Sequence, residues 1–418
     1  MVPETVSDAS ARRLQVVIIG AGFGGLTCAR SLEALGTVDV TLVDRNAYQL
    51  FAPLLYQVAT GGIPEDDIAY PIRAAIPGVH FIRGDVVRIT PAGRTVRLED
   101  GTVLTWDMLV LAMGSVGTTF GIPGVQEFAL QMKDIRQARA IKHRLLTTYE
   151  DVQRGHKPKE ALRVVVVGGG PTGVEVAGAV AEFQKQMVRE FPEIAALAHV
   201  TLVEAGPRLL PMFSPQSSAR AQASLESLGV RVQVNAAVDR MYATDVHLKG
   251  GEVLPAGTVI WGAGVAAPEQ WTDLGTSDRA NRLVVDGHLK LGDDIWVIGD
   301  MAHARDVDKG GDTPLPMVAS VAMQQGRYVA RAIDASLRND AIPPFRYKDK
   351  GQMATIGRRL AVVELPNGTR IHGTLAWLAW LGLHVAYLAG GRNRVSVMAD
   401  WFWNYLAWTT GPRRTVID

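Results

Sequence analysis

A ten-residue stretch near the N-terminus, VVIIGAGFGG at residues 16–25, places the strongest constraint on how the chain folds. Its first four residues are β-branched and predict a short buried strand, which a helix pattern (26–36) and a second strand ending on Asp44 follow. Between strand and helix, three glycines stand at G-x-G-x-x-G spacing: Gly20, Gly22 and Gly25. In a βαβ unit such glycines permit a tight turn, the approach of a pyrophosphate and close helix packing. We therefore expect a dinucleotide-binding unit whose Asp44 binds a ribose.

The same pattern occurs again in the middle of the chain. A strand at 164–167 leads into GGGPTG, a helix and a further strand that ends on Glu204. The glycines that carry the pattern are Gly168, Gly170 and Gly173. Two such units indicate a flavoenzyme that takes electrons from a nicotinamide nucleotide, with FAD in the first unit and NADH in the second. Because a carboxylate at Glu204 repels a 2′-phosphate, we expect NADH to be preferred over NADPH, although Arg208 lies nearby.

The composition of the chain excludes several other classes of function. Its 418 residues carry a formal net charge of +1, so no global charge favours nucleic acid. The single cysteine, Cys28, rules out flavoenzymes that work through a redox-active cysteine pair, and it fits a reducing compartment. The nine histidines show no ligand spacing, and we expect no metal site.

Two acidic residues have both a functional and a structural interpretation. Glu175 either contacts the nicotinamide end of NADH or is favoured near the helix start by the helix dipole alone. Asp300 ends the strand pattern IWVIGD and accepts a flavin or ribose hydroxyl, caps the next segment, or does both. Two further strands, 107–114 and 259–264, stop on a glycine, which suits a nucleotide lying beside the strand end.

We expect an α/β fold of two doubly wound, Rossmann-like domains, followed by a C-terminal helical region that associates with a membrane. The FAD domain is placed at residues 1–120 and 285–345, the NADH domain at 121–284, and the C-terminal region, packed on the FAD domain, at 346–418. Residues 1–14 are interpreted as a mobile tail of a protein that is not exported, and 45–61 as a loop or broken helix. Long helices are expected over 133–150, 213–228 and 316–333.

The C-terminal region differs from the rest in its aromatic residues and charge. Residues 371–391 contain no charge apart from neutral histidines, and after GGRNR the residues 395–410 are again apolar. Aromatic side chains share one face of each expected helix: Trp377, Trp380, His384 and Tyr387 on the first, and Trp401, Tyr405 and Trp408 on the second. Such belts are typical of interfacial helices when they stand beside arginines, here Arg392, Arg394, Arg413 and Arg414. We expect an in-plane hairpin on an anionic lipid surface; a membrane span and a buried core or dimer helix are the alternatives.

Taken together, these motifs resemble the type II NADH:quinone dehydrogenases, a family of single-chain enzymes that do not pump protons. The resemblance is carried by VVIIGAGFGGL, FAPLLYQVATGGI, VVVVGGGPTGVE, VIWGAG, VIGDMA, VAMQQGRYVA, DKGQMATIGRR and LGLHVAYLAGGRNR. It implies bound FAD, oxidation of NADH, a membrane quinone as acceptor in a respiratory chain, a homodimer, and monotopic attachment to the cytoplasmic face of the inner membrane. It also places the quinone near Gln324, Gln325 and Gln57. One residue departs from the family pattern, because Ser320 stands where a glutamine is usual and lacks its amide.

The expected site residues form two groups. The candidate catalytic residues are Glu175, Gln324 and Gln325. The cofactor contacts are expected at Gly20, Gly22, Phe23, Gly24, Gly25, Asp44, Gln57, Gly114, Asp300 and Ala322, and at Gly168, Gly170, Pro171, Thr172, Gly173, Glu204 and Gly264. The expected activity is NADH:quinone oxidoreductase. A reductase of a small electron-carrier protein and a non-enzymatic flavin- and NADH-binding redox sensor are the alternatives.

Overall fold

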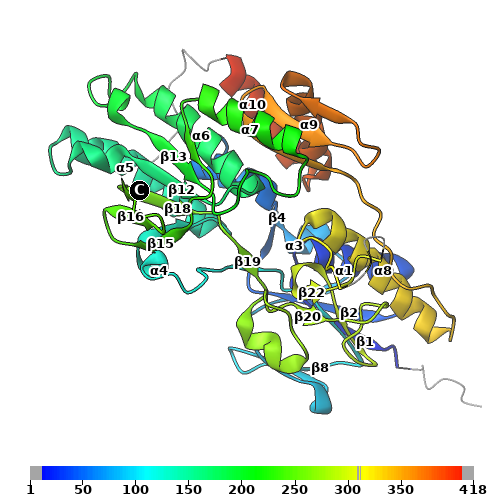
Figure 1. Cartoon of the computed structure of the whole chain (residues 1–418). Helices are drawn as coiled ribbons and strands as arrows, with labels where there is room; N and C mark the ends of the chain where they lie inside the picture. The colour runs from blue at the N-terminus through cyan, green and yellow to red at the C-terminus, as the bar shows by residue number, and fades with distance from the viewer. Residues whose placement is uncertain (1–11, 308–309, 311, 407–418) are drawn as a thin grey trace, which may run out of the picture. The chain divides into compact units, whose positions relative to one another are not determined.

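The computed structural model describes residues 12–307, 310 and 312–406, and these fall into two compact units (Figure 1). Unit 1 comprises residues 12–49, 71–115 and 266–348, and unit 2 comprises residues 50–70, 116–265 and 349–406. Most of the expected N-terminal tail, together with Trp408, Arg413 and Arg414, lies outside the described residues. The boundaries that we expect for the two cofactor domains stay predictions.

Unit 1 is built on a parallel sheet with the strand order β21-β9-β1-β2-β5. These strands are β1 (Gln15–Ile19), β2 (Asp39–Asp44), β5 (His80–Arg83), β9 (Met108–Leu111) and β21 (Ile295–Val297). Residues 16–19 of β1 are almost fully buried because neighbouring strands flank both edges and helices cover the faces. The strand predicted from the β-branched run, and the second strand ending on Asp44, are confirmed.

Two long helices of unit 1 pack directly against each other and lie side by side in Figure 1: α1 (Phe23–Leu35) and α8 (Ala319–Leu337). A Cβ at Gly326 of α8 would lie 2.4 Å from the carbonyl oxygen of Gly24 in α1. The two helix backbones therefore touch, and only glycine fits at their crossing. The expected helix over 316–333 is confirmed, although it begins three residues later.

The remaining elements of unit 1 are short. An antiparallel meander is inserted between β5 and β9, and a two-stranded parallel pair lies near the end of the unit. Their bounds are α3 (Ile72–Ala75), β6 (Val86–Thr90), β7 (Thr95–Leu98), β8 (Val103–Thr105), β20 (Leu283–Val284) and β22 (Ala302–His303). The 3-10 turns of this unit are η3 (Pro91–Gly93), η6 (Glu269–Leu274) and η7 (Gly299–Met301).

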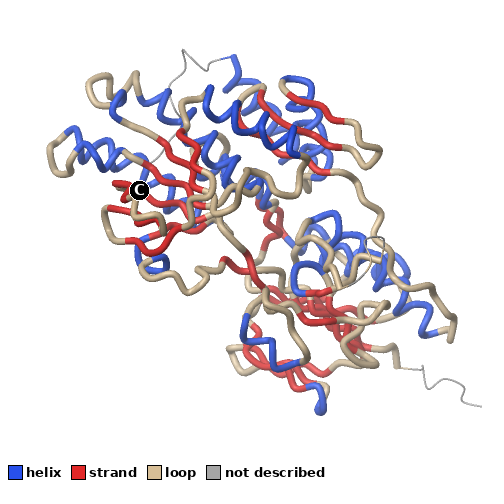
Figure 2. Tube along the Cα trace, viewed as in Figure 1, coloured by secondary structure: helices blue, strands red, loops and turns tan. Residues whose placement is uncertain are grey.

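Unit 2 repeats the strand arrangement of unit 1, except that one outer strand comes first in the chain instead of last. Its parallel sheet has the order β11-β18-β12-β13-β14, with β12 and β13 in the places of β1 and β2, and it too has an inserted antiparallel meander (Figure 2). The sheet strands are β11 (Ala129–Gln131), β12 (Val164–Val167), β13 (Val200–Val203), β14 (Arg231–Gln233) and β18 (Thr258–Trp261). The meander strands are β15 (Val238–Met241), β16 (Asp245–Leu248) and β17 (Val253–Pro255).

The helices in the middle segment of unit 2 are α4 (Val125–Phe128), α5 (Ile135–Gln153), α6 (Pro171–Met187) and α7 (Pro215–Ser227), with 3-10 turns η4 (Lys159–Leu162) and η5 (Ala195–Leu197). The predicted helices over 133–150 and 213–228 are confirmed as α5 and α7. Residues 45–61 are expected to form a loop or a broken helix, and residues 52–59 form the broken helix, as η1 (Ala52–Leu54) followed by α2 (Leu55–Ala59). Where the chain passes between the units lie β3 (Tyr48–Leu50), β4 (Ala69–Pro71), β10 (Val116–Gly117) and β19 (Val265–Ala266).

The C-terminal region forms an antiparallel sheet followed by two helices. The elements are β23 (Gln352–Gly357), β24 (Leu360–Glu364), β25 (Arg370–His372), α9 (Thr374–Tyr387) and α10 (Gly391–Leu406). The region contacts α6 and α7 of unit 2, and also the turn η2 (Glu65–Ile68), which lies within the residues 1–120 expected for the FAD domain. Its packing on an FAD domain stays a prediction. One expectation needs correction: the predicted break at GGRNR is shorter than expected, because Gly391 already begins α10.

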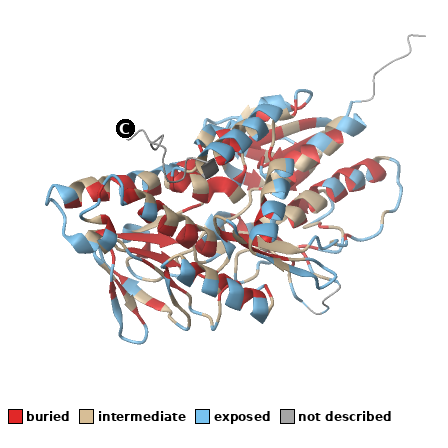
Figure 3. Ribbon diagram, turned by 90° about the horizontal axis from the view of Figure 1, so that it is seen from above, coloured by how far each residue is buried: buried red, intermediate tan, exposed pale blue. Residues whose placement is uncertain are grey.

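The hairpin α9–α10 is present, but its aromatic face points inward. Trp377, Trp380 and Trp401 are 9%, 1% and 6% exposed, and Trp380 stacks on His384. The large exposed apolar side chains of the hairpin are Leu375, Leu378, Leu383, Tyr387, Val395, Met398, Phe402 and Trp403. Tyr387, which is expected on the aromatic face, is therefore not buried with the tryptophans. Throughout the described residues, helices show buried and exposed sides while sheet strands are mostly buried (Figure 3). No helix within the described ranges is long and apolar enough to cross a membrane.

Candidate active site

The first glycine loop combines two crowded glycines with one open one. A Cβ would lie 2.3 Å from Ala112 O at Gly20, which has a φ of +102°, and 1.8 Å from Gly20 O at Gly25. At Gly22, by contrast, a Cβ would meet nothing within 4 Å. The crowded positions hold strand and helix together, and the open position leaves room for a ligand, so the loop fits a dinucleotide pyrophosphate.

Asp44 closes this loop from the end of β2. Its carboxylate accepts hydrogen bonds from the backbone N–H groups of Ala21 and Asn46, both at 2.7 Å. Burial raises the pKa of the Asp44 carboxyl, while these two donors act against that rise. The carboxylate oxygens keep lone pairs for a ribose diol, as the sequence motif predicts.

The other expected flavin contacts of unit 1 gather where β21 ends. Asp300 accepts a hydrogen bond from the Ser115 hydroxyl at 2.6 Å and lies in the turn η7, so it does not cap α8. Gly299, at φ +71°, donates its N–H to the amide oxygen of Gln325 at 2.6 Å. A Cβ at Gly299 would lie 3.5 Å from the Cβ of Ala322. The unit thus brings the start of α8 to the same turn as Asp300.

The two adjacent candidate glutamines of α8 have different surroundings. Gln325 is 1% exposed and is bound to the Gly299 turn. Gln324 is bound to the backbone of Lys348, donating to its carbonyl at 2.9 Å and accepting from its N–H at 3.0 Å. Ser320, the departure from the family pattern, shares a hydrogen bond with the hydroxyl of Tyr347 at 2.9 Å.

The second glycine loop, in unit 2, has the geometry of the first. A Cβ would lie 2.8 Å from the Ala263 backbone at Gly168 and 1.7 Å from Gly168 O at Gly173, but would meet nothing within 4 Å at Gly170. Pro171 and Thr172 open α6 directly after the loop. Because the structure repeats both the crowded and the open positions, this loop fits a second dinucleotide.

Glu204 takes the place that Asp44 has in unit 1. Its carboxylate accepts the N–H of Gly169 at 2.5 Å and the N–H of Gly206 at 2.6 Å. The nearby Arg208 is occupied, since its guanidinium donates to Phe213 O at 2.6 Å and to Pro211 O and Ser218 Oγ, each at 2.7 Å. Arg208 is therefore engaged within its own loop and is not placed to bind a 2′-phosphate.

The way in which the helices begin supports the same ligand positions at the two glycine loops. The helices α5 and α7 begin with side-chain caps, Asp134 and Ser214, which accept backbone N–H groups of the first turn. By contrast, α1, α6 and α8 have no side-chain cap. Their first-turn N–H groups are thus left to other acceptors, which suits helices that face an anionic or polar ligand.

The remaining expected contacts lie at the edges of these loops. Phe23 and Gly24 form the first residues of α1, and a Cβ at Gly24 would lie 3.4 Å from Ala322 O. Gly114 and Gly264 follow β9 and β18 and have φ values of +71° and +76°, which glycine adopts most readily.

Glu175 lies beyond the first turn of α6, so the helix dipole does not explain it. Burial raises the pKa of its carboxyl to about 8, against a hydrogen bond with the backbone of Thr355. Two turns further along α6, Glu182 accepts the N–H of Arg358 at 2.6 Å. Between them, a Cβ at Gly178 would lie 1.5 Å from Ile356 O. Sequence reasoning missed this docking of α6 on the edge of β23, although the i, i+3, i+7 spacing of Glu-Gly-Glu was a signal.

Gln57, on α2, lies among residues of the C-terminal hairpin. It accepts a hydrogen bond from the Trp401 indole and donates one to the Tyr56 hydroxyl, both at 2.8 Å. Beside them, burial lowers the pKa of His384 to about 4, although its ring bonds the Trp380 carbonyl at 2.7 Å. His384 is thus neutral at physiological pH and carries its proton on Nδ1.

The described residues offer neither a metal centre nor a thiol nucleophile. No group of three or more histidine, cysteine or acidic side chains there has an arrangement that could hold a metal ion. Cys28 is buried, and burial raises the pKa of its thiol to about 12.

Comparison with known families agrees with this geometry. A family model described as pyridine nucleotide-disulphide oxidoreductase matches residues 14–326, and a model for the NDH2 C-terminal domain matches residues 350–407. Two Mycobacterium tuberculosis proteins named type II NADH:quinone oxidoreductase, Ndh and NdhA, are each 38% identical to this chain. The matches cover 97% and 93% of this chain and 91% and 86% of those proteins.

Solved structures show the same fold at lower identity. The structure of NDH2 from Plasmodium falciparum in complex with NADH has a TM-score of 0.88 and 22% identity, covering 97% of this chain and all of that one. The sulfide:quinone oxidoreductase of Aquifex aeolicus has a TM-score of 0.74 and 19% identity over 96% of this chain and 95% of its own. The chain therefore belongs to the type II NADH:quinone oxidoreductases, within the pyridine nucleotide-disulphide oxidoreductase superfamily.

Proposed function

We propose that this chain carries out the reaction of its family, in which NADH is oxidised and a membrane quinone is reduced, without proton pumping. One observation carries the proposal: the chain has two dinucleotide loops but a single, buried cysteine. Electrons that enter at a nicotinamide site therefore have no disulfide to leave through. When bound, FAD supplies the redox centre that accepts an electron pair from NADH and reduces the quinone.

Unit 1 is assigned to FAD. The open backbone at Gly22 accommodates the pyrophosphate, and Asp44 accepts ribose hydroxyls. Asp300 and the uncapped start of α8 face the remainder of the cofactor in this assignment. Gln325 supports that turn from behind by holding the Gly299 N–H, so its contribution is to orient the turn.

Unit 2 is assigned to NADH. The open backbone at Gly170 accommodates the pyrophosphate, and Glu204 accepts the ribose diol while held by two backbone N–H groups. Its negative charge opposes a 2′-phosphate, and Arg208 is engaged within its own loop. NADH is therefore the expected donor.

The quinone is assigned to the surroundings of Gln57 and of Gln324 and Gln325, as the family resemblance implies. The association with lipid is assigned to the exposed apolar side of the α9–α10 hairpin. Leu375 and Phe402 there are 71% and 66% exposed, and Arg392 at the start of α10 is an exposed cation. Arg394 keeps its charge but is held on the hairpin, where it donates to Leu388 O at 2.8 Å and to Ala386 O at 3.1 Å. A peripheral homodimer on the cytoplasmic face of the inner membrane completes the proposal.

Steady-state turnover of the purified protein tests the reaction. We expect a yellow protein with one FAD per chain that oxidises NADH rapidly with a short-chain quinone and slowly with a ferredoxin or with oxygen alone. A colourless protein that takes up no FAD would overturn the proposal. Faster reduction of the carrier protein would identify a carrier reductase, and NADH binding without turnover on any acceptor would identify a redox sensor.

Vesicle flotation tests the lipid assignment separately. Leu375→Ser with Phe402→Ser removes apolar surface without touching the buried tryptophans. We expect this double variant to float less with vesicles of phosphatidylglycerol and phosphatidylcholine, while soluble-quinone turnover stays unchanged. The control exchanges two exposed valines elsewhere, Val87→Ser with Val253→Ser, which are 53% and 47% exposed. Equal flotation of both double variants would show that the exposed side of the hairpin does not bind the lipid surface.

A further inference from the structure

The loop that follows Glu204 connects the NADH-binding strand to helix α7. Within it, Leu210 donates its N–H to the carbonyl of Gly169, in the second glycine loop, at 2.7 Å. Arg208 fastens the loop internally through the carbonyls of Pro211 and Phe213. The position of the glycine loop at the adenosine end of NADH thus depends on where residues 205–213 lie.

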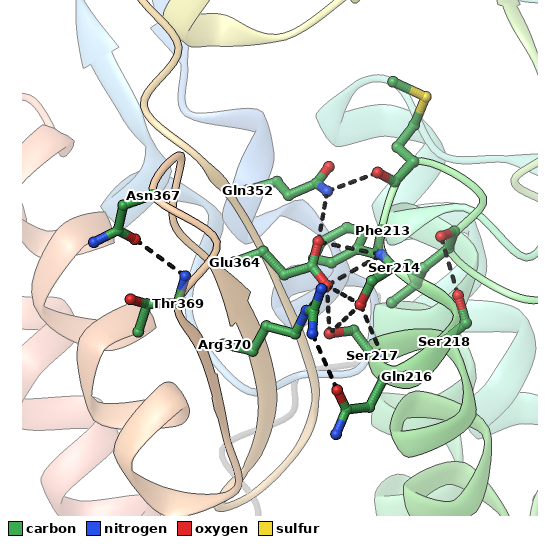
Figure 4. Close-up of polar contacts among 12 residues, drawn as sticks. Phe213, Ser214, Gln216, Ser217, Ser218, Gln352, Glu364, Asn367, Thr369 and Arg370 are labelled. Atoms are coloured by element: carbon green, nitrogen blue, oxygen red, sulfur yellow. Dashed lines mark hydrogen bonds and ion pairs between the residues drawn. The ribbon is translucent and has the colours of Figure 1, made fainter.

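The far end of this loop is held by a carboxylate from the C-terminal sheet. Glu364, at the end of β24, accepts hydrogen bonds from the hydroxyls of Ser214 and Ser217, the second at 2.6 Å, and from the Ser214 N–H at 3.0 Å (Figure 4). Gln352 on β23 donates both to Glu364 at 3.2 Å and to Met212 O at 2.7 Å. We call these five residues the β24 clamp. It fixes both the last loop residues and the first turn of α7.

The electrostatics of the clamp favour the ionised carboxylate. Burial alone would raise the pKa of Glu364, but the donors on Ser214, Ser217 and Gln352 outweigh it and hold the pKa below its ordinary value. The carboxylate also lies at the positive end of the α7 dipole. A charged clamp is therefore present throughout the neutral pH range.

We propose that Glu364 is a positioning residue for the adenosine half of NADH, acting through the 205–213 loop on Gly169 and Glu204. The inference rests on the assignment of NADH to unit 2. In this view the C-terminal sheet sets the affinity for NADH as well as carrying the hairpin. Loosening the clamp weakens the binding of NADH without altering the chemistry at the nicotinamide end, so KM rises and kcat does not fall.

The test is Glu364→Gln in the full chain, which removes the charge and keeps the size of the side chain. We expect KM for NADH to rise about tenfold, the size of an effect near 1.4 kcal/mol, with kcat, KM for a soluble quinone and FAD content unchanged. Inhibition by ADP-ribose, which is NADH without its nicotinamide ring, should weaken by the same factor. Glu364→Asp keeps the charge and should restore part of the affinity.

Two further variants separate positioning from general damage. Ser214→Ala with Ser217→Ala removes the donors from the α7 side and should reproduce the KM effect, with little added by Glu364→Gln. The matched control is Asn367→Ala in the turn of the same sheet, whose side chain accepts only the Thr369 N–H at 3.1 Å (Figure 4). It should leave every parameter unchanged.

An unchanged KM for NADH in Glu364→Gln would overturn the inference. So would a rise in KM that comes with lost FAD or unaffected ADP-ribose inhibition, since both describe a structural role only. If the parent protein fails to reduce quinone, the proposed function fails. Direct titration of ADP-ribose into parent and variant then still tests the clamp.

Discussion

The indole Nε1 of Trp401 donates to the amide oxygen of Gln57 over 2.8 Å, which ties helix α10 to helix α2. The amide nitrogen of Gln57 donates in turn to Tyr56 at 2.8 Å, so both ends of the amide are committed. The orientation of Gln57 is thereby fixed by a residue more than three hundred positions away in the sequence. An indole that is 6% exposed and anchored in this way has a structural task besides any contact with lipid.

Trp401→Phe removes the indole donor and keeps an aromatic ring. Because Gln57 is assigned to the quinone site, we expect KM for a soluble quinone to rise about fivefold, in line with about 1 kcal/mol for one hydrogen bond. KM for NADH should stay at the parent value. The matched control is Trp403→Phe, at a side chain that is 56% exposed. Equal effects of the two variants on KM for quinone would contradict the role of the Trp401–Gln57 bond.

Glu204→Gln tests the choice of nucleotide. The variant loses the charge that opposes a 2′-phosphate and weakens the bonds to Gly169 and Gly206. We expect kcat/KM for NADH to fall about tenfold and the preference for NADH over NADPH to narrow. The control is Glu252→Gln, an exposed carboxylate in the same unit that pairs with Arg231. If the ratio of kcat/KM for NADPH to kcat/KM for NADH is the same in Glu204→Gln as in the parent, Glu204 does not face the 2′-position.

Glu175 predicts a specific dependence of stability on pH. Its pKa is raised from 4.5 to about 8, so the folded protein keeps a proton that the unfolded chain releases. The stability contributed by this group is fully present below pH 4.5 and is lost as the pH rises towards 8. The side chain of Glu175→Gln cannot ionise. The free energy of unfolding of this variant, relative to that of the parent, should therefore be about 2 kcal/mol higher at pH 8.5 than at pH 5, after allowance for partial solvent contact.

Thermal unfolding of parent and variant at the two pH values measures this difference. The control is the exposed Glu226→Gln on α7, which should track the parent at both. A Tm difference between Glu175→Gln and the parent that does not change with pH would show that the carboxyl titrates normally.

Two glycines test how closely the C-terminal sheet docks. Gly178→Ala must push β23 away from α6, because its Cβ would lie 1.5 Å from Ile356 O, and both carboxylate bonds of α6 would lengthen. We expect a loss of about 3 kcal/mol or more of stability. Gly382→Ala on α9 meets nothing within 4 Å and should gain about 0.5–1 kcal/mol through helix propensity. Unfolding of the two variants in denaturant, monitored through the release of flavin, distinguishes them. Comparable stabilities of the two variants would argue against tight docking.

Features set by neighbours in the sequence were predictable. The glycine loops, Asp44 and Glu204 lie where their spacing places them, because a βαβ turn is decided within about thirty residues. The broken helix at 45–61 was predictable for the same local reason, the proline at position 53. The sequence also pointed correctly to two helices at the C-terminal end.

Features set by distant partners were not predictable. The α9 sequence is apolar on nearly every side, so its pattern does not identify the buried face. That face is chosen by contacts with Phe51 and Tyr56, which lie more than three hundred residues earlier. The β24 clamp and the docking of Glu175 and Glu182 likewise join segments that are far apart in the chain. Their residue types occur on any polar surface, and only the folded geometry gives them partners.

The solitary thiol of Cys28 makes the chain a convenient background for site-directed probes. With a pKa of about 12 and no solvent contact, it resists alkylating reagents while the protein stays folded. A thiol introduced by Phe402→Cys or Leu375→Cys would thus be the sole labelled position without replacement of the native Cys28. A spin label or fluorophore at these exposed sites reads depth in a bilayer directly, and one at Met212, which is 61% exposed, reads the nucleotide loop. The same molecule can therefore report on its lipid contact and on its donor site by two independent signals.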